Sequence, residues 1–442
     1  MRNHGASRLP VPARRCQSDE NTADDRSRMT TALLTDRYEL TMLEAALGGG
    51  LAEHRAVFEV FCRRLPPGRR FGVVAGQGRL AGLLPQVRYG QAELAALDFL
   101  GARACDWLRD RELSLDVTAY AEGETYVPGS PVLTVEGSFG EGLLLETLVL
   151  SVLNADSAVA SAAARMVLAA GGRPLLEMGG RRTHEQAAVA AARAAYVAGF
   201  AMTSNLEAGR RHGVPTAGTS AHAFTLAHAD ERAAFAAQVR TLGAGTTLLV
   251  DTYDTAQGIR NAVEVAGTGL GAVRLDSGDP LEEVPRARAL LDSLGATRTR
   301  IVVTGDLDEH SIAALAEQPV DVYGVGTSVV TGSGAPTAGF VYKLVAVARE
   351  PGPGAPLVPV AKTSSGKSTV GGRKWAYRTS DGQEVLRLAP GGDGRPLQRP
   401  LPVVDDVPAA RAHCARAVAA LPDAARDLGA GPPAWSTTLE DA

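Results

Sequence analysis

The sequence predicts an α/β protein with a parallel sheet, preceded by a smaller α+β domain. Six short β-rich runs recur between about residue 174 and residue 330, and each ends in a polar, glycine-bearing cluster before a segment with helical apolar spacing. Repeated βα units favour a parallel sheet, because parallel strands need a crossover connection. Ligands bind at the carboxyl ends of the strands in such sheets, so the polar clusters are predicted to face one mouth.

The predicted elements alternate along this region. The strand-like runs are PLLEMGGRRTH, VPTAGTSAH, TTLLVDTYDT, AVRLDSGD, RIVVTGDLDE and VDVYGVGTSVV. The helical segments are HEQAAVAAARAAYVAG, DERAAFAAQVRTLG, AQGIRNAVEVAG, LEEVPRARALLDSLG and DEHSIAALAEQ, several of which open with an acidic first turn. The polar residues at the predicted mouth are Arg181, Thr219, His222, Asp251, Arg274, Asp276, Asp279, Asp306 and Thr327. These residue types are typical of phosphate and metal binding.

The flanking regions read differently from the repeated units. Residues 30–150 combine a helix-like LTDRYELTMLEAAL with alternating strand-like runs and a Pro128-Gly129 turn, which indicates an α+β domain. Residues 151–345 hold the βα units. Residues 346–442 are too broken to form a core, so we expect them to pack back on the N-terminal domain, with an alanine-rich helix from residue 408 and a loose end. Residues 1–29 are polar and predict a disordered tail, or sequence upstream of a start at Met29.

Composition excludes several classes of protein. A net charge of -4 without a basic stripe argues against nucleic acid as a partner. No apolar run is expected to reach the ~20 residues of a membrane span, and the first residues lack the apolar core of a signal peptide. The four cysteines lie far apart without CxxC spacing, which predicts a reducing, cytoplasmic location, no structural zinc and no disulfide.

Nine motifs occur in order between about residues 33 and 378. They are TDRYELTML, FCRRLP, GGRRTHEQAAVAAARAAYVAGFAMTSN, GTSAHAF, DTYDT, RLDSGD, TGDLDE, GVGTSVV and SGKSTVGGRK. Each one alone is weak, but the ordered set resembles nicotinate phosphoribosyltransferase. The resemblance implies a type II phosphoribosyltransferase fold, an irregular α/β barrel with an N-terminal α+β domain completed by C-terminal residues. It also implies that nicotinate, phosphoribosyl pyrophosphate and ATP give nicotinate mononucleotide, pyrophosphate, ADP and phosphate, in the Preiss-Handler salvage route of NAD biosynthesis.

The implied reaction needs cations around the leaving group. Displacement of pyrophosphate from the anomeric carbon builds positive charge on the ribose and negative charge on the pyrophosphate. Arg181, Arg182 and a magnesium ion held by Asp276 and Asp279 would stabilise that charge, and the planar guanidinium binds phosphate in a bidentate way. The alternative for the arginine pair is a solvated helix start.

His222 in GTSAH matches the histidine that the family phosphorylates from ATP. A neutral imidazole nitrogen is a good phosphoryl acceptor. The alternative is a barrel histidine that only hydrogen-bonds a neighbouring strand. His184 and His228 are interpreted as helix-surface histidines.

Other positions take their predicted roles from the resemblance. Thr219 would lie beside nicotinate, and Arg274 would contact the nicotinate carboxylate or the product phosphate. Tyr38 would stack on nicotinate from the partner subunit, which requires a homodimer; core packing is the default for an unaligned tyrosine. Gly305, Asp306, Gly326 and Thr327 are further substrate-binding candidates, the last two as a phosphate cradle.

Several positions stay open. Asp251 and Asp254 resemble a metal-facing loop but could equally cap helices. Gly366 and Lys367 would reach ATP or phosphate, or belong to a basic turn. The chain departs from the family pattern at Arg37, Glu39 and Gly371.

Two other functions compete with this one. A type II phosphoribosyltransferase acting on nicotinamide or quinolinate would share the barrel, although quinolinate would demand extra basic residues. A catalytically silent nucleotide-binding protein is the other alternative. The hydrophobic run into two acidic residues that marks type I phosphoribosyltransferases is not found in the sequence.

Overall fold

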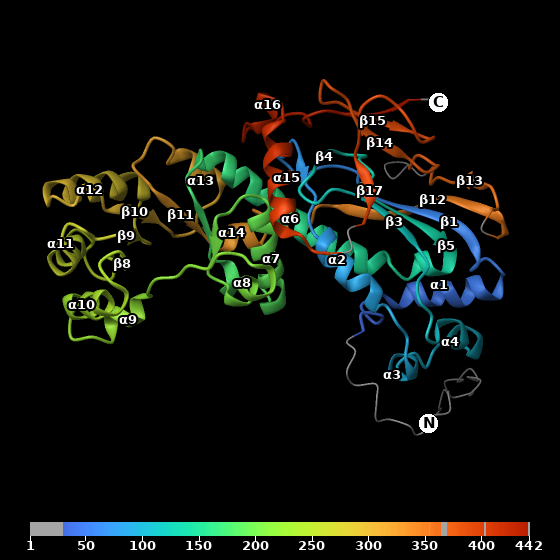
Figure 1. Cartoon of the computed structure of the whole chain (residues 1–442), viewed down its shortest axis with the longest axis horizontal. Coiled ribbons are helices and arrows are strands. Elements are labelled where there is room, and N and C mark those ends of the chain that lie inside the picture. The colour runs from blue at the N-terminus through green and yellow to red at the C-terminus, as the bar shows by residue number, and fades with distance from the viewer. Residues whose placement is uncertain (1–29, 353, 364–368, 402–403, 441–442) are drawn as a thin grey trace, which may run out of the picture.

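The computed structural model describes residues 30–352, 354–363, 369–401 and 404–440. The predictions for residues 1–29, Gly366 and Lys367 therefore lie outside the described residues. Two bodies stand side by side, an N-terminal domain and a parallel sheet with its helices, and the long helix α6 lies between them (Figure 1). The predicted α/β class with a separate α+β domain is confirmed.

The N-terminal domain is built on an antiparallel six-stranded sheet that takes strands from both ends of the chain. Its order is β13-β12-β1-β5-β3-β17. These strands are β13 (Leu357–Pro359), β12 (Phe340–Pro351), β1 (His54–Cys62), β5 (Leu133–Ser138), β3 (Asp116–Tyr120) and β17 (Gln398–Pro400). Around them lie α1 (Arg37–Gly48), β2 (Gly72–Val73), α2 (Gln77–Leu83), η2 (Leu84–Gln86), α3 (Gln91–Ala95), α4 (Ala102–Leu108), β4 (Thr125–Tyr126) and α5 (Phe139–Leu143). The first domain is thus completed by C-terminal strands at both edges, and β12 runs across the boundary expected at residue 345.

Helix α6 (Glu146–Ala170) packs against both bodies, and its buried side chains contribute to the hydrophobic core of each. Its two buried charges are paired, Asp156 with Arg79 at 2.6 Å and Arg165 with Glu309 at 3.1 Å. By length and composition alone this helix could cross a membrane, so the expectation that no apolar stretch would be long enough was wrong. The window that meets this test is 72% buried inside the protein, as in a core helix of a globular protein.

The second body is a curled six-stranded sheet whose strands all run parallel. Its order is β7-β6-β11-β10-β9-β8, with β6 (Leu175–Glu177), β7 (Met202–Thr203), β8 (Thr247–Leu249), β9 (Ala272–Leu275), β10 (Arg300–Val303) and β11 (Val322–Val325). Its helices are η3 (Gly179–Arg181), α7 (Glu185–Val197), α8 (Leu206–His212), α9 (His222–Leu226), α10 (Glu231–Leu242), α11 (Thr255–Ala266), α12 (Pro280–Ser293), α13 (Glu309–Ala314) and α14 (Thr327–Val330). All five predicted helices are confirmed. In the described part of the chain β7 does not pair with β8, so the sheet forms a half-barrel.

One predicted strand is wrong. The run VPTAGTSAH forms only an isolated bridge, between Thr216 and Thr203, and β7 takes the place beside β6 instead. The second residue of the run is Pro215, and the run also contains Gly218. Both residue types weaken a strand, because proline lacks the N–H donor and glycine lacks a side chain to pack. The segment after the bridge is therefore free to bend toward the mouth.

The C-terminal region forms a small sheet of its own and a helix that bridges the two bodies. The sheet order is β16-β14-β15-β18, with β14 (Trp375–Arg378), β15 (Glu384–Arg387), β16 (Arg395–Pro396) and β18 (Thr437–Glu440). The predicted loose end is wrong, because β18 pairs with β15 and the buried Trp435 donates to Glu384 at 3.3 Å. Helix α15 (Val407–Ala419), followed by α16 (Asp423–Arg426), packs against α7 and β4 (Figure 1).

Candidate active site

The polar residues predicted at the mouth lie where the parallel strands end. Arg274 is the centre of this group. It is the third residue of β9 and is 7% exposed, because both faces of the strand are covered. Its Nη1 donates to Thr219 Oγ1 and to the carbonyl of Ser220, both at 3.2 Å, and its Nε donates to Thr304 Oγ1 at 3.2 Å. One guanidinium therefore holds the GTSAH loop against the ends of β9 and β10.

Asp276 lies beside this guanidinium. Its Oδ1 is 3.5 Å from Arg274 Nη2 and also accepts a hydrogen bond from the Thr304 hydroxyl. Burial raises the pKa of Asp276, but the Thr304 hydrogen bond, Arg274 and His222 lower it more, so the pKa stays below its ordinary value. Asp276 is thus held ionised at the mouth.

His222 begins α9 and is about one-third exposed. Its Nδ1 lies 3.1 Å from Thr252 Oγ1, and its Nε2 lies 3.8 Å from Asp276 Oδ2. The imidazole is thus oriented from two sides, by a hydroxyl and by a carboxylate, while part of the ring stays open to solvent. A ring placed this way has a nitrogen available to solvent beside an ionised carboxylate.

The loop after β10 crosses directly over Asp276. A Cβ on Gly305 would lie 2.6 Å from the Asp276 carbonyl oxygen, and Gly305 has φ +100, so both the space and the backbone conformation require glycine there. Asp306 follows with φ 51 and is exposed. Both residues border the Arg274 group.

The loops after β6 and β11 form the other side of the mouth. A Cβ on Gly179 would lie 2.8 Å from the Gly326 carbonyl oxygen, so the two loops are in close contact. Arg181 and Arg182 are exposed, and within the described ranges neither side chain forms an ion pair. Thr327 begins α14 and is exposed as well. All three side chains are therefore exposed on the loops that form this side of the mouth.

Two predicted aspartates serve as helix caps. Asp279 accepts from the backbone N–H of Leu281 at 2.9 Å at the start of α12, and Asp254 accepts from Gln257 at 2.7 Å at the start of α11. Asp251 has a different environment. It is 8% exposed, its Oδ2 accepts from the Asp276 N–H at 2.7 Å, and its Oδ1 has no partner among the described residues. It also borders a cavity of about 420 Å³ that extends between α11 and α12.

Tyr38 lies far from this group within one chain. Its helix α1 is at the opposite end of the molecule from α9, α11 and α12 (Figure 1). The side chain is 44% exposed, and partial burial together with the neighbouring Glu146 raises its pKa well above the ordinary value. A role for Tyr38 at a mouth therefore needs a second chain.

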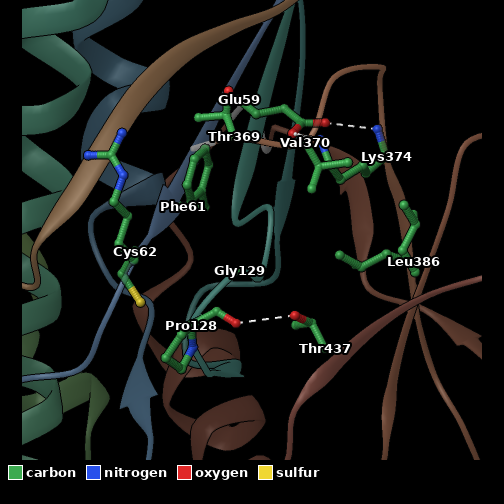
Figure 2. A pocket seen from close by; sticks show the side chains of 12 residues that line it. Glu59, Phe61, Cys62, Pro128, Gly129, Thr369, Val370, Lys374, Leu386 and Thr437 are labelled. Carbon is green, nitrogen blue, oxygen red and sulfur yellow. Dashed lines mark hydrogen bonds and ion pairs between the residues drawn. The ribbon is translucent and has the colours of Figure 1, made fainter. Parts of the chain in front are cut away.

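Two more of the motifs meet in the N-terminal domain, around a cavity of about 500 Å³ (Figure 2). FCRRLP contributes Phe61 and Arg63, and the last motif contributes Thr369 and Lys374. Lys374 Nζ pairs with the buried Glu59 at 2.7 Å, and Arg63 Nε is buried with no partner among the described residues. Like Tyr38, this cavity belongs to the body that does not carry His222.

Thr252 and Thr304 are the contacts that sequence reasoning missed. The contact of Thr304 could have been predicted from the register of the sheet. Leu275 of β9 pairs with Val303 of β10, so the residues that follow them, Asp276 and Thr304, lie side by side. The contact between His222 and Thr252 joins loops 30 residues apart, and no local pattern indicates it.

Comparison with known proteins bears on this arrangement. Residues 33–154 match the family model described as nicotinate phosphoribosyltransferase (NAPRTase) N-terminal domain, and residues 159–333 match that of the quinolinate phosphoribosyl transferase C-terminal domain. Nicotinate phosphoribosyltransferase pncB1 of Mycobacterium tuberculosis is 55% identical over 458 residues, covering 97% of this chain and 98% of the relative. This chain belongs to the nicotinate phosphoribosyltransferase family.

More distant relatives support the same family assignment. The Bacillus subtilis nicotinate phosphoribosyltransferase is 38% identical over 78% of this chain and 73% of its own length. The crystal structure of human nicotinic acid phosphoribosyltransferase superposes with a TM-score of 0.75 at 28% identity, over 92% of this chain and 97% of the human chain. The crystal structure of the nicotinate-nucleotide pyrophosphorylase of Pyrococcus furiosus superposes with a TM-score of 0.73 at 25% identity. The superposition covers 91% of this chain and 98% of the Pyrococcus chain. The half-barrel with its N-terminal domain is therefore a type II phosphoribosyltransferase fold.

Proposed function

We propose that this protein transfers the phosphoribosyl group of phosphoribosyl pyrophosphate to nicotinate for NAD biosynthesis, and that it couples the transfer to ATP hydrolysis through a phosphohistidine at His222. The observation that carries the proposal is the group formed by His222, Asp276 and Arg274. An imidazole, an ionised carboxylate and a buried guanidinium meet there at the ends of parallel strands. Nucleophile, cation-binding group and anion-binding group are thus within one mouth.

Arg274 and Thr219 support nicotinate as the base. The guanidinium is almost fully buried, and its one carboxylate neighbour, Asp276, is 3.5 Å away. A carboxylate on a flat aromatic ring would find a planar donor there. The ring nitrogen of nicotinate attacks the anomeric carbon, the C–O bond to pyrophosphate breaks, and the pyrophosphate leaves with the bonding electrons. Arg181 and Arg182, exposed on the facing loop, are positioned to neutralise it.

His222 supports the coupling to ATP. A lone pair of the imidazole attacks the γ-phosphorus, ADP leaves, and water later cleaves the P–N bond to release phosphate. Thr252 orients the ring through Nδ1, and Asp276 approaches Nε2. The negative charge of a phosphorylated His222 would lie beside Asp276, where a divalent cation would hold the two together.

Magnesium is the cation we propose, held by Asp251 and Asp276. Asp251 Oδ1 is a buried carboxylate oxygen without a partner among the described residues, which suits a hard cation. Asp279 is less suited, because its carboxylate caps α12. The described residues contain no cluster of three or more metal-binding side chains, and Mg²⁺ commonly binds through one or two carboxylates together with substrate phosphates. When bound, the ion would neutralise charge on the pyrophosphate.

We further propose that the active enzyme is a homodimer in the cytoplasm. Tyr38, Arg63 and Lys374 belong to family motifs, yet they lie in the body that does not carry His222. A second chain that presents this body to the mouth would bring all the motifs to one site. Cys62 and Cys414 are buried thiols, as suits a reducing compartment.

Transfer to quinolinate is the alternative that one observation favours. The barrel region matches the quinolinate phosphoribosyl transferase family model. Quinolinate carries a second carboxylate, whereas among the described residues Arg274 is the one buried guanidinium with a hydrogen bond to Thr219. The match of the N-terminal residues favours nicotinate.

The proposal is tested with γ-labelled ATP and magnesium. We expect acid-labile label on the wild-type protein, none on His222→Ala, and mononucleotide formed from nicotinate in preference to nicotinamide or quinolinate. His228→Ala is the matched control, because this histidine lies on the same short segment and contacts the Phe224 carbonyl instead of the Asp276 group. Absence of label and of product from each base would overturn the proposal and leave a binding protein.

A further inference from the structure

An apolar cleft lies between α6, the end of α7 and α15. Its volume is about 460 Å³, within the range of small-molecule sites. The walls are aliphatic: Val167 and Leu168 come from α6, Val197 from α7 and Val418 from α15. No aromatic side chain is among the described residues that line it. The walls therefore suit a flexible alkyl chain more than a flat ring.

Two arginines stand at this cleft without a buried acidic partner. Arg411 donates to the carbonyls of Tyr196, Gly199 and Phe200 at the end of α7, and within the described chain it has no carboxylate partner. Burial lowers the pKa of Arg411. Its charge is met by the partial negative charge of a helix end, about half an elementary charge, and by the ring of Tyr196, whose centroid lies 4.3 Å from the guanidinium carbon.

Arg426 is the second of these arginines. It donates to the Ala419 carbonyl at 2.5 Å, and its ionic partner Asp423, at 3.5 Å, is 99% exposed. Its Nε is buried and has no hydrogen-bond partner among the described residues. A buried donor without a partner is destabilising, so a ligand that supplies an acceptor there is favoured.

The cleft is separate from the mouth. Helix α7 begins beside the Arg181 loop and ends at Val197, so its 13 residues place the cleft about 20 Å from the mouth. The residues that line it belong to none of the strand ends that carry the catalytic group. A ligand bound in this cleft would therefore be distinct from the substrates of transfer.

We propose that this cleft binds a medium-chain aliphatic carboxylate, with the head group at Arg426 and Arg411 and the alkyl chain against α6 and α15. The excess positive charge selects the anionic head, and the aliphatic walls select the chain. The inference does not rest on the proposed transfer reaction, because it concerns binding alone.

The test is calorimetric titration of the full chain with decanoate, below the concentration at which it forms micelles, beside decanol and decyltrimethylammonium. We expect decanoate to bind at least about tenfold more tightly than either analogue, a difference of about 1.4 kcal/mol. Arg426→Met keeps an apolar stem but removes the charge, so decanoate should then bind no better than decanol. Ala415→Trp places a ring in the cleft from an exposed position and should abolish binding.

Arg416→Met is the matched control. Arg416 is an exposed arginine of α15, the helix that carries Arg411, and it does not line this cleft, so its removal should leave decanoate affinity unchanged. Thermal unfolding of each variant separates loss of the site from loss of the fold. Equal affinity for decanoate and decanol, no binding by the wild-type protein, or undiminished binding by Ala415→Trp would each overturn the proposal.

Discussion

Asp251 Oδ2 accepts a hydrogen bond of 2.7 Å from the backbone N–H of Asp276. This bond ties the loop after β8 to the loop after β9 and leaves Asp251 Oδ1 without a partner in the described structure. The two carboxylates that we propose as magnesium ligands are thus held in one arrangement before any ion binds.

Asp251→Asn should weaken magnesium binding while keeping the loops in place. The amide oxygen can still accept from Asp276, but the negative charge is lost, so we expect the magnesium concentration for half-maximal transfer to rise about tenfold. Asp279→Ala is the comparison, because it removes only a helix cap. It should cost about 1 kcal/mol of stability in urea unfolding and leave the magnesium requirement unchanged. The reverse pattern would identify Asp279 as the ligand.

Thr304→Val should shift the acid limb of the pH–activity profile to higher pH. The Thr304 hydroxyl, Arg274 and His222 together outweigh burial and lower the pKa of Asp276. A lowered pKa means that the ionised group stabilises the fold above the pKa of the unfolded chain, and that this contribution is lost as the pH falls through the folded value. Without the hydroxyl the pKa rises, so Asp276 becomes protonated at a higher pH. An unchanged acid limb would contradict this role.

Thr252→Val should lower the yield of phosphohistidine more than it lowers transfer measured without ATP. The hydroxyl lies 3.1 Å from His222 Nδ1 and fixes the ring. Labelling with γ-labelled ATP and transfer without ATP are measured on the same preparations. Thr252→Ser restores the hydroxyl and should restore the label. If Thr252→Ser and Thr252→Val give the same yield of phosphohistidine, the contact of Thr252 with His222 contributes only packing.

Tyr38→Ala and His222→Ala should complement each other. If each site combines Tyr38 of one subunit with His222 of the other, both pure variants have low activity. Mixed dimers formed by unfolding and refolding the two together contain one intact site, which gives about a quarter of the wild-type activity. No gain on mixing would show that Tyr38 acts within its own chain or not at the mouth.

Glu124→Gln should destabilise the fold at neutral pH by about 3 kcal/mol. Burial raises the pKa of Glu124, but His413 and Arg395 outweigh it and bring the pKa to about 2. The ionised carboxylate therefore stabilises the folded protein above its ordinary pKa, and this contribution is lost as the pH falls toward 2. Urea unfolding at pH 7 and pH 3 should show the difference between variant and wild type shrinking with acid.

The sequence predicted the parallel units well, because strand and helix periodicities are local and strong in this region. It failed at VPTAGTSAH, where a bridge beside β7 stands in place of a strand, and at β18, which pairs with residues of β15 that lie 53 positions earlier, such as Glu384 opposite Thr437. These outcomes depend on tertiary contacts that a local pattern does not contain.

The sequence predicted which residues belong to the site better than it predicted the contacts between them. Arg274, Asp276 and His222 stand at predicted strand ends and do meet. Asp279 is followed by Pro280, an arrangement that favours a helix cap over a metal ligand, and this signal was available in the sequence. The separation of Tyr38 from the mouth follows from how the two bodies are placed, which no motif encodes.

The pairing of β1 with β12 has a consequence for synthesis of the chain. Ala56 lies opposite Val347, so the first domain to leave the ribosome cannot complete its sheet until almost three hundred further residues have been made. The half-barrel, whose strands follow one another closely, can form in the meantime. A nascent chain should therefore acquire protease resistance in the half-barrel first, while β1 keeps an unpaired edge that invites holding by a chaperone.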